Sequence, residues 1–151
     1  MTTFDIRRTD PHAPQATALL QASHALMQSL FAAEDNHYLE ISELCEDHIR
    51  FFAAWDGDTA LSCVALAEMA GYGEVKSMFV SPDARGKGTG AALMDHIERE
   101  ARALGLSELK LETGNTLYEA HRLYHRSGFE PCEVFGNYAE SPASLFMRKS
   151  L

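Results

Sequence analysis

The sequence has few cysteines, no long apolar run and a shortage of basic residues. Its three cysteines, Cys45, Cys63 and Cys132, lie far apart and form no CxxC or Cys/His motif. Their spacing therefore predicts neither a disulfide framework nor a metal site. No run of about 18 apolar residues is present to span a bilayer, and the N-terminal MTTFDIRRTD lacks the apolar core of a signal peptide. We therefore expect a cytoplasmic protein with reduced thiols.

The shortage of basic residues limits the partners. Lys and Arg total 13 against 22 Asp and Glu, and the formal net charge is −9. The summed field repels polyanions, which argues against binding to nucleic acid or to an anionic membrane. A small phosphorylated ligand can still bind where positive side chains gather at one loop. At 151 residues, without repeats or linkers, the chain is expected to form one domain over residues 1–151.

Hydrophobic periodicity and turn residues predict an α+β order of elements. Strands on both sides of Asp56-Gly57 form a hairpin, because this dipeptide favours a tight turn. A third strand completes an antiparallel meander, and a helix then leads to a parallel strand. The expected elements are a strand (2–8), helices (13–31 and 41–46), strands (48–55, 59–69 and 74–80), a helix (91–104), a strand (107–113), a helix (117–127) and strands (129–134 and 145–148).

A glycine-rich loop joins the third strand of the meander to the following helix. Glycine has no Cβ, so it lets the backbone turn tightly and approach a ligand. The N-terminus of a helix also presents free N–H groups to an anion. Two basic side chains lie within the loop, which therefore predicts a phosphate-binding segment. Its residues are Arg85-Gly86-Lys87-Gly88-Thr89-Gly90.

Three classes of ligand use such a loop. The GxxxxGK(S/T) pattern of a P-loop is absent. A dinucleotide fingerprint is formally matched by Gly86, Gly88 and Ala91, with Glu112 near the expected distance. Its context differs, however, because an antiparallel meander precedes the loop and residues 81–85 separate the strand from the glycines. An NAD-binding domain therefore remains a distant alternative.

The third class is defined by a resemblance to a family. The loop resembles the (Q/R)xxGx(G/A) acetyl-CoA loop of the GNAT superfamily of N-acetyltransferases, and AHRLYHRSGF at residues 120–129 resembles its AxxLYxxxGF helix. LETG at residues 111–114 and FGNY...SPASLFM near the C-terminus are similar to bacterial members of the PaiA and YsnE type. The resemblance covers roughly residue 51 onward. It implies a three-layer α/β/α fold with a mixed, mostly antiparallel sheet of about six to seven strands and about four helices.

The resemblance also implies a reaction. Acetyl-CoA would donate its acetyl group to a primary amine of a small molecule or protein, by direct attack in a ternary complex. Glu74 lies eleven residues before Arg85, the offset of the catalytic glutamate in histone-type members, and would accept the amine proton. The Met78 amide would stabilise the oxyanion. Tyr124 would protonate the leaving thiolate, and no metal is needed.

Further cofactor contacts follow from the same resemblance. The backbone of Phe79 and Val80 would pair with the pantetheine arm, where the sheet of family members splays. Many members place an asparagine three residues before the alanine of AxxLY, but this sequence has Leu117 there. Asn115 lies two residues earlier, and the sequence leaves open whether it makes the contact instead.

The acceptor would enter opposite acetyl-CoA, between the loop after the first helix and the last strands. The residues expected to line this side are His37, Tyr38, Glu112 and Tyr138. A homodimer through the last strands would be usual for the resemblance. The main alternative function is a non-catalytic sensor or interaction module that binds acyl-CoA without turnover.

Overall fold

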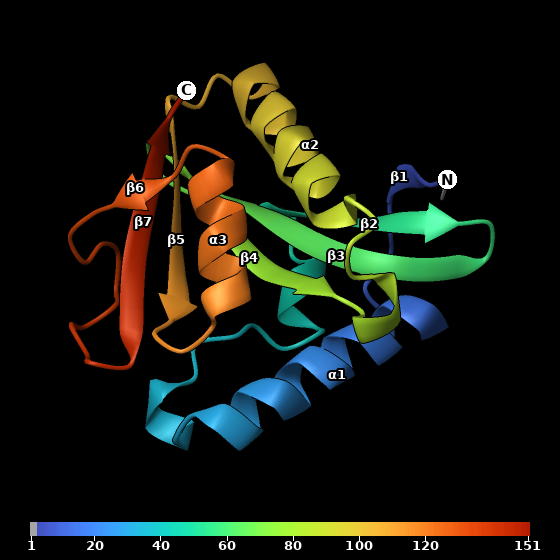
Figure 1. Cartoon of the computed structure of the whole chain (residues 1–151). Helices are drawn as coiled ribbons and strands as arrows, with labels where there is room; N and C mark the ends of the chain where they lie inside the picture. The colour runs from blue at the N-terminus through green and yellow to red at the C-terminus, as the bar shows by residue number, and fades with distance from the viewer. Residues whose placement is uncertain (1–2) are drawn as a thin grey trace.

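A computed structural model describes residues 3–151 and shows a seven-stranded sheet with helices on both faces (Figure 1). The strands are β1 (Asp5–Arg8), β2 (Ile49–Asp56), β3 (Thr59–Glu68), β4 (Gly73–Val80), β5 (Glu108–Gly114), β6 (Glu130–Pro131) and β7 (Ser144–Ser150). The α-helices are α1 (Pro14–Leu30), α2 (Thr89–Ala103) and α3 (Tyr118–Arg126), and the short 3-10 helices are η1 (Ala33–Asp35), η2 (Glu43–Cys45) and η3 (Pro82–Ala84).

The strand order is β1-β2-β3-β4-β5-β7-β6, and only β4 and β5 pair in parallel. This parallel pair is joined by α2, as the predicted crossover requires. Helix α1 covers one face of the sheet, while α2 and α3 cover the other (Figure 1). The predicted α+β class, the three layers and the mixed, mostly antiparallel sheet are confirmed.

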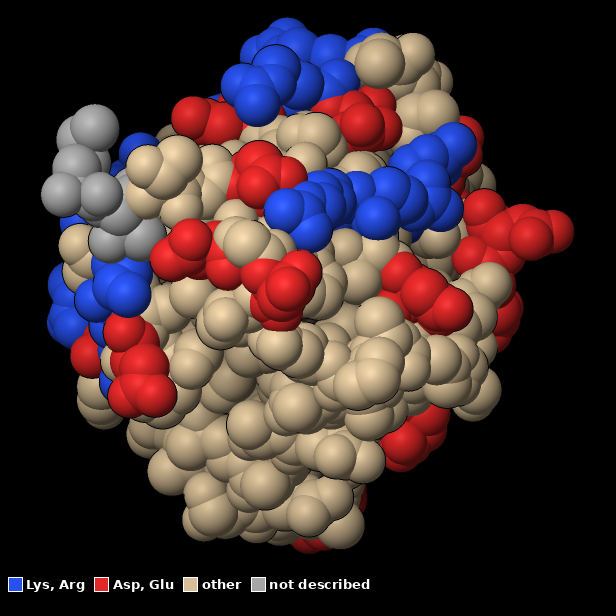
Figure 2. Space-filling view, turned by 90° about the vertical axis from the view of Figure 1, so that its right-hand side faces the viewer, with Lys and Arg blue, Asp and Glu red and all other residues tan. Residues whose placement is uncertain are grey.

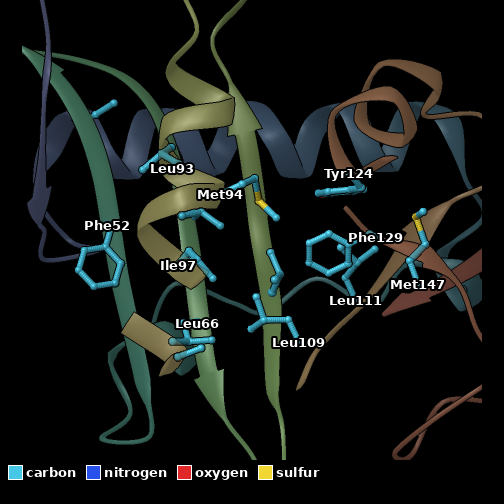
Figure 3. Close-up of a cluster of buried hydrophobic side chains, with 14 residues drawn as sticks. Phe52, Leu66, Leu93, Met94, Ile97, Leu109, Leu111, Tyr124, Phe129 and Met147 are labelled. Atoms are coloured by element: carbon cyan, nitrogen blue, oxygen red, sulfur yellow. The ribbon is translucent and has the colours of Figure 1, made fainter. Parts of the chain in front are cut away.

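The central strand β3 separates two buried clusters. It is buried from end to end except at its first and last residues, as expected for a strand covered on both faces. Val64 and Leu66 face the α2 side, where Leu93 and Ile97 complete the cluster (Figure 3). Ala65 and Ala67 face α1. Since successive side chains of a strand point to opposite faces, this single segment anchors both layers.

Two predicted elements are much shorter in the structure. The helix expected over 41–46 is reduced to η2, in which only Leu44 is buried, too little apolar surface to stabilise an isolated α-helical turn. The strand expected over 129–134 pairs with β7 only through Glu130 and Pro131. Cys132 N–H still donates to Phe146 O of β7 at 2.9 Å, but residues 132–135 form no further ladder pair and the chain turns at residues 136–137. The first residue of the strand expected over 2–8 lies outside the described residues.

Charged side chains are unevenly distributed over the surface. Figure 2 shows them mainly on the upper part of one face, whereas the lower part, where α1 lies, is largely uncharged. The α1 sequence, PQATALLQASHALMQSL, contains no Asp, Glu, Lys or Arg. None of the helices within residues 3–151 is long and apolar enough to cross a membrane.

Candidate active site

The parallel strands β4 and β5 are paired only at their first residues. Gly73 pairs with Leu109 and Glu74 with Lys110, and no further pairs join the two strands. A bulge in β4 explains why β4 diverges from β5. The register of the β3–β4 ladder shifts after Lys76, and Ser77 has a positive φ of 55°. A bulge bends its strand and increases the twist. Figure 1 shows β4 leading away from β5, with α3 in front of them.

The glycine loop follows β4 and begins α2. Gly86 and Gly88 both have a φ of +80°, a conformation that costs other residues about 1–2 kcal/mol. Gly88 is the N-cap of α2 and provides no side-chain hydrogen bond, so the first N–H groups of the helix remain available for an anion. A Cβ on Gly90 would lie 3.2 to 3.4 Å from side chains of β4 and α3, those of Leu123, Met78 and Val80.

Two cations accompany this loop. Arg85 lies 3.4 Å from the carboxylate of Glu119, and both side chains are at least half exposed. Lys87 is exposed as well. An exposed ion pair contributes little to stability, so the loop can exchange the Arg85–Glu119 contact for a ligand at small cost. Thr89, by contrast, is buried at the start of α2.

The predicted base, Glu74, lies in a polar cluster. Its side chain is only 6% exposed. Tyr138 donates a hydrogen bond to Glu74 Oε2, and Lys76 Nζ lies 3.6 Å from the same oxygen. Lys76 also donates to the Tyr138 hydroxyl (2.7 Å) and to the backbone oxygen of His37 (3.0 Å). Within residues 3–151 no group donates to Glu74 Oε1, which leaves this oxygen as the one that can receive a proton.

Glu112 lies next to this cluster. It accepts a hydrogen bond of 2.8 Å from Ser144 Oγ. Burial raises the pKa of Glu112, while the Ser144 hydrogen bond and the neighbouring His37 and Lys76 oppose the rise. Burial also raises the pKa of Tyr138, and the charge of Glu74 adds to this effect. The two carboxylates and Tyr138 therefore share one partly desolvated environment.

The predicted proton donor, Tyr124, lies on the other side of the sheet. It extends from α3 beside Phe129, with ring centroids 6.0 Å apart (Figure 3). Its side chain is 6% exposed. Burial raises the pKa of Tyr124, with a smaller contribution from the charge of Glu112. The hydroxyl therefore stays protonated at neutral pH.

Two predicted residues have other surroundings. The Tyr38 hydroxyl accepts a hydrogen bond of 2.9 Å from Gln28, and the Tyr38 ring stacks on that of His24 with the centroids 4.0 Å apart. Tyr38 therefore packs against α1. Asn115 is exposed, and its backbone N–H donates to Ala143 O. The structure thus brings Glu74, Glu112, Tyr138 and the backbone of His37 together, while Tyr38 and Asn115 have separate contacts.

A cavity of about 1060 Å³ lies between α3 and the segment that connects β6 to β7. No residue of the predicted site lines it. Two residues that line the cavity, Ser144 and Phe146, also contact the polar cluster. The Ser144 hydroxyl donates a hydrogen bond to Glu112, and the ring centroid of Phe146 lies 5.7 Å from that of Tyr138. The acidic and phenolic groups of the predicted site lie instead in the cluster around Glu74.

Lys76 is the residue of this cluster that the sequence analysis missed. Residues two apart on a strand face the same side, so a lysine at this position had to share its face with Glu74. Its side chain is 11% exposed. A lysine buried to this extent is rare unless it is paired, and here it joins β4 to two distant loops.

Comparison with known proteins identifies the family. The model of the acetyltransferase (GNAT) family matches residues 16–129. An IAA acetyltransferase of Azospirillum brasilense is 43% identical over 155 residues, covering 100% of both chains. An uncharacterized N-acetyltransferase, YsnE, of Bacillus subtilis is 36% identical over 140 residues, covering 91% of this chain and 93% of that one.

A solved structure agrees with this assignment. A crystal structure from Klebsiella pneumoniae, described as that of an acyl-CoA N-acyltransferase, superposes with a TM-score of 0.83 and 27% identity, covering 100% of this chain and 99% of the other. The chain therefore belongs to the GNAT acetyltransferase family, which uses acetyl-CoA as its co-substrate. The predicted family and the predicted enzyme class are confirmed.

Proposed function

We propose that the protein transfers the acetyl group of acetyl-CoA to a primary amine of a small molecule or protein, by direct attack in a ternary complex. The observation that carries this proposal is the buried Glu74 carboxylate, which lies where β4 and β5 separate. Within the described residues, no group donates a hydrogen bond to its Oε1 atom. A carboxylate so placed can accept a proton from an ammonium, directly or through one water. An alkylammonium has a pKa of about 10 and must lose a proton before it attacks a thioester.

The cofactor would bind along β4 and the start of α2. The N–H groups at the N-terminus of α2 would hold the pyrophosphate, with Arg85 and Lys87 adding positive charge. The loop residues Gly86, Gly88, Thr89 and Gly90 would keep this helix start close to the ligand. The backbone of Met78, Phe79 and Val80, freed from β5 by the divergence of the strands, would pair with the pantetheine arm. Asn115 is a further candidate contact.

The chemistry would proceed in two steps. After Glu74 has accepted the ammonium proton, the neutral amine nitrogen attacks the thioester carbon, and the Met78 N–H would stabilise the oxyanion. The nitrogen of this intermediate then releases its second proton to solvent. The C–S bond then breaks, leaving the acetylated amine and a CoA thiolate. Tyr124 would donate a hydrogen bond to this sulfur and supply its proton. Burial raises the pKa of Tyr124, so its hydroxyl is protonated and can donate. The proton that it gives up would be replaced from solvent.

The acceptor would lie against His37, Tyr38, Glu112 and Tyr138. Glu112 is suited to a cationic group because it is a second carboxylate in the same environment, and the net charge of −9 favours the approach of cations. The relative from Azospirillum brasilense is named an IAA acetyltransferase. A cytoplasmic location and a homodimer through the last strands remain predictions.

A thiol-release assay tests this function. Purified protein and acetyl-CoA are incubated with polyamines, amino acids, aminoglycosides, peptides and indole compounds, and acetylated products are identified by mass spectrometry. We expect stoichiometric CoA release and N-acetylation with at least one amine. Calorimetric binding of acetyl-CoA without turnover on any acceptor would favour the alternative, a non-catalytic acyl-CoA sensor. Absence of binding would exclude both functions.

A further inference from the structure

The turn before α1 and the η2 turn bring three potential metal ligands together on the surface. These are the carboxylate of Asp10, the imidazole of His12 and the thiol of Cys45. Cys45 Sγ lies 3.3 Å from His12 Nδ1, and Asp10 Oδ1 lies 3.7 Å from the same nitrogen. All three donor atoms lie within 4.8 Å of one another.

These separations fit one metal ion. Zinc bonds of about 2.3 Å to sulfur and about 2.0–2.2 Å to nitrogen and oxygen, in a tetrahedron, place the ligand atoms about 3.4–3.6 Å apart. The two distances to His12 Nδ1, 3.3 and 3.7 Å, bracket this range, and the Asp10 carboxylate and Cys45 Sγ lie within 4.8 Å of each other. A metal could therefore be bound with only small side-chain rotations.

The backbone holds the ligands in place. His12 N–H donates to Asp10 Oδ1 at 2.9 Å, and Ala13 N–H donates to Asp10 O at the same distance. Buried residues lie next to the ligands in sequence, Pro11 between Asp10 and His12, and Leu44 before Cys45. Ligands fixed in this way lose little entropy when they bind a metal, which favours affinity.

The surrounding charge favours a cation. Two of the ligands, Asp10 and Cys45, line a hollow of about 410 Å³ whose other charged lining residues are Glu46, Asp47 and one cation, Arg8. The combination of thiolate, imidazole and carboxylate suits Zn²⁺ rather than Mg²⁺ or Ca²⁺, which prefer oxygen ligands alone. The three protein ligands leave a fourth position for water.

We propose that Asp10, His12 and Cys45 form a surface site for a divalent transition metal, with preference for Zn²⁺ over Mg²⁺ and Ca²⁺. Binding forms a metal–sulfur bond and releases the thiol proton to solvent. Its three ligands are not among the residues assigned to acetyl transfer. It would cross-link the β1–α1 connection to the segment that follows His37 and Tyr38, and so stabilise that segment.

Sequence spacing could not reveal this site. His12 and Cys45 are 33 residues apart, whereas the recognisable zinc motifs have paired ligands two to five residues apart. Only the fold brings the two turns together.

Cobalt spectroscopy on tag-free protein tests the proposal. Titration with Co²⁺ should produce a thiolate-to-cobalt charge-transfer band that saturates at one equivalent and disappears when Zn²⁺ is added. The band should be lost in Cys45→Ser, while His12→Ala and Asp10→Asn should each bind Co²⁺ at least about tenfold more weakly. The matched controls, Cys132→Ser and the exposed-histidine variant His125→Ala, should retain the band.

Thermal unfolding provides a second measurement. Zn²⁺ at a hundredfold excess over its Kd should raise the Tm by about 5–10 °C in wild type and not in Cys45→Ser. Variants with the wild-type Tm in chelator show that the fold is intact, and Cys45→Ala replaces Cys45→Ser if the serine variant fails this check. No charge-transfer band, a band that survives Cys45→Ser, or unchanged Co²⁺ affinity in His12→Ala would overturn the proposal. Competition by Mg²⁺ or Ca²⁺ at equal concentration would also contradict it.

Discussion

The hydroxyl of Tyr138 donates a hydrogen bond to Glu74 Oε2, which ties the segment before β7 to the start of β4. A hydrogen bond to a charged group contributes about 1.5–3 kcal/mol. It holds Glu74 by Oε2, while no group within residues 3–151 donates to Oε1. Tyr138 thus links the proposed acceptor side to the predicted base.

Tyr138→Phe should therefore lower kcat by about 10–100-fold. The KM for acetyl-CoA should stay unchanged, because Tyr138 has no contact with the glycine loop. Steady-state kinetics at saturating acceptor measure both quantities. Tyr118→Phe is the matched control, since the Tyr118 side chain is 62% exposed. Equal kcat values for the two variants would remove Tyr138 from this role.

Gly88→Ala should impair acetyl-CoA binding. A Cβ at Gly88 meets no atom within 4 Å, so the cost arises from its φ of +80° alone, about 1–2 kcal/mol. Relief of this strain would reorient the first N–H groups of α2 and raise the KM for acetyl-CoA. Gly57→Ala is the control, because Gly57 also has positive φ and open space but lies in the β2–β3 hairpin. Both variants should lose a few degrees of Tm, and only Gly88→Ala should change the KM.

Tyr124→Phe should slow the chemical step by up to about 10²–10⁴-fold. The buried ring is kept, so the Tm should change little. Single-turnover release of CoA, followed with a thiol reagent, measures this step separately from product release. Wild-type rates in this variant would assign thiolate protonation to solvent instead.

The stability of the protein should depend on the ionisation of Glu112. Burial raises the pKa of Glu112, so the folded protein binds this proton more tightly than the unfolded chain does. The contribution favours folding at low pH and is lost as the pH rises through the raised pKa. Glu112→Gln removes the titrating group while leaving an acceptor for Ser144. Relative to wild type, its free energy of unfolding should increase between about pH 4 and about pH 7.

Urea unfolding at several pH values tests this sign. Glu140→Gln, which changes an exposed carboxylate, should show a constant difference from wild type. A difference for Glu112→Gln that is constant or shrinks with rising pH would show that Glu112 is not destabilised by burial in the folded state.

The sequence predicted the local features and missed the contacts between distant segments. Hydrophobic periodicity located α1 and α2 to within a few residues, and the glycine pattern located the start of α2, because both depend on neighbouring residues. The family resemblance predicted Glu74 as the base from its offset to Arg85, and this role stays a prediction. No pattern showed that Lys76 and Tyr138 meet on one of its oxygens. These contacts join residues 62 and 64 positions apart. They depend on how the loops return to the sheet, which short-range propensity does not determine.

The shortened elements have a similar cause. A strand is expected over residues 129–134, yet its ladder with β7 contains only two residue pairs, followed by one hydrogen bond from Cys132 to Phe146 and a turn at residues 136–137. Residues 41–46 have helical spacing but bury only Leu44. In both cases tertiary packing decided how far the local preference extended.

The measurement that tests the account most directly is the pH–rate profile of kcat/KM for wild type and Glu74→Gln with an amine acceptor found in the screen. Glu108→Gln, which changes another ion-paired carboxylate on the sheet, is the control. We predict that Glu74→Gln binds acetyl-CoA as wild type does but is about 10²–10⁴-fold slower at neutral pH, with a rate that recovers as the pH approaches the pKa of the amine. A Glu74→Gln profile that matches wild type in height and shape would contradict the assignment of Glu74 as the base.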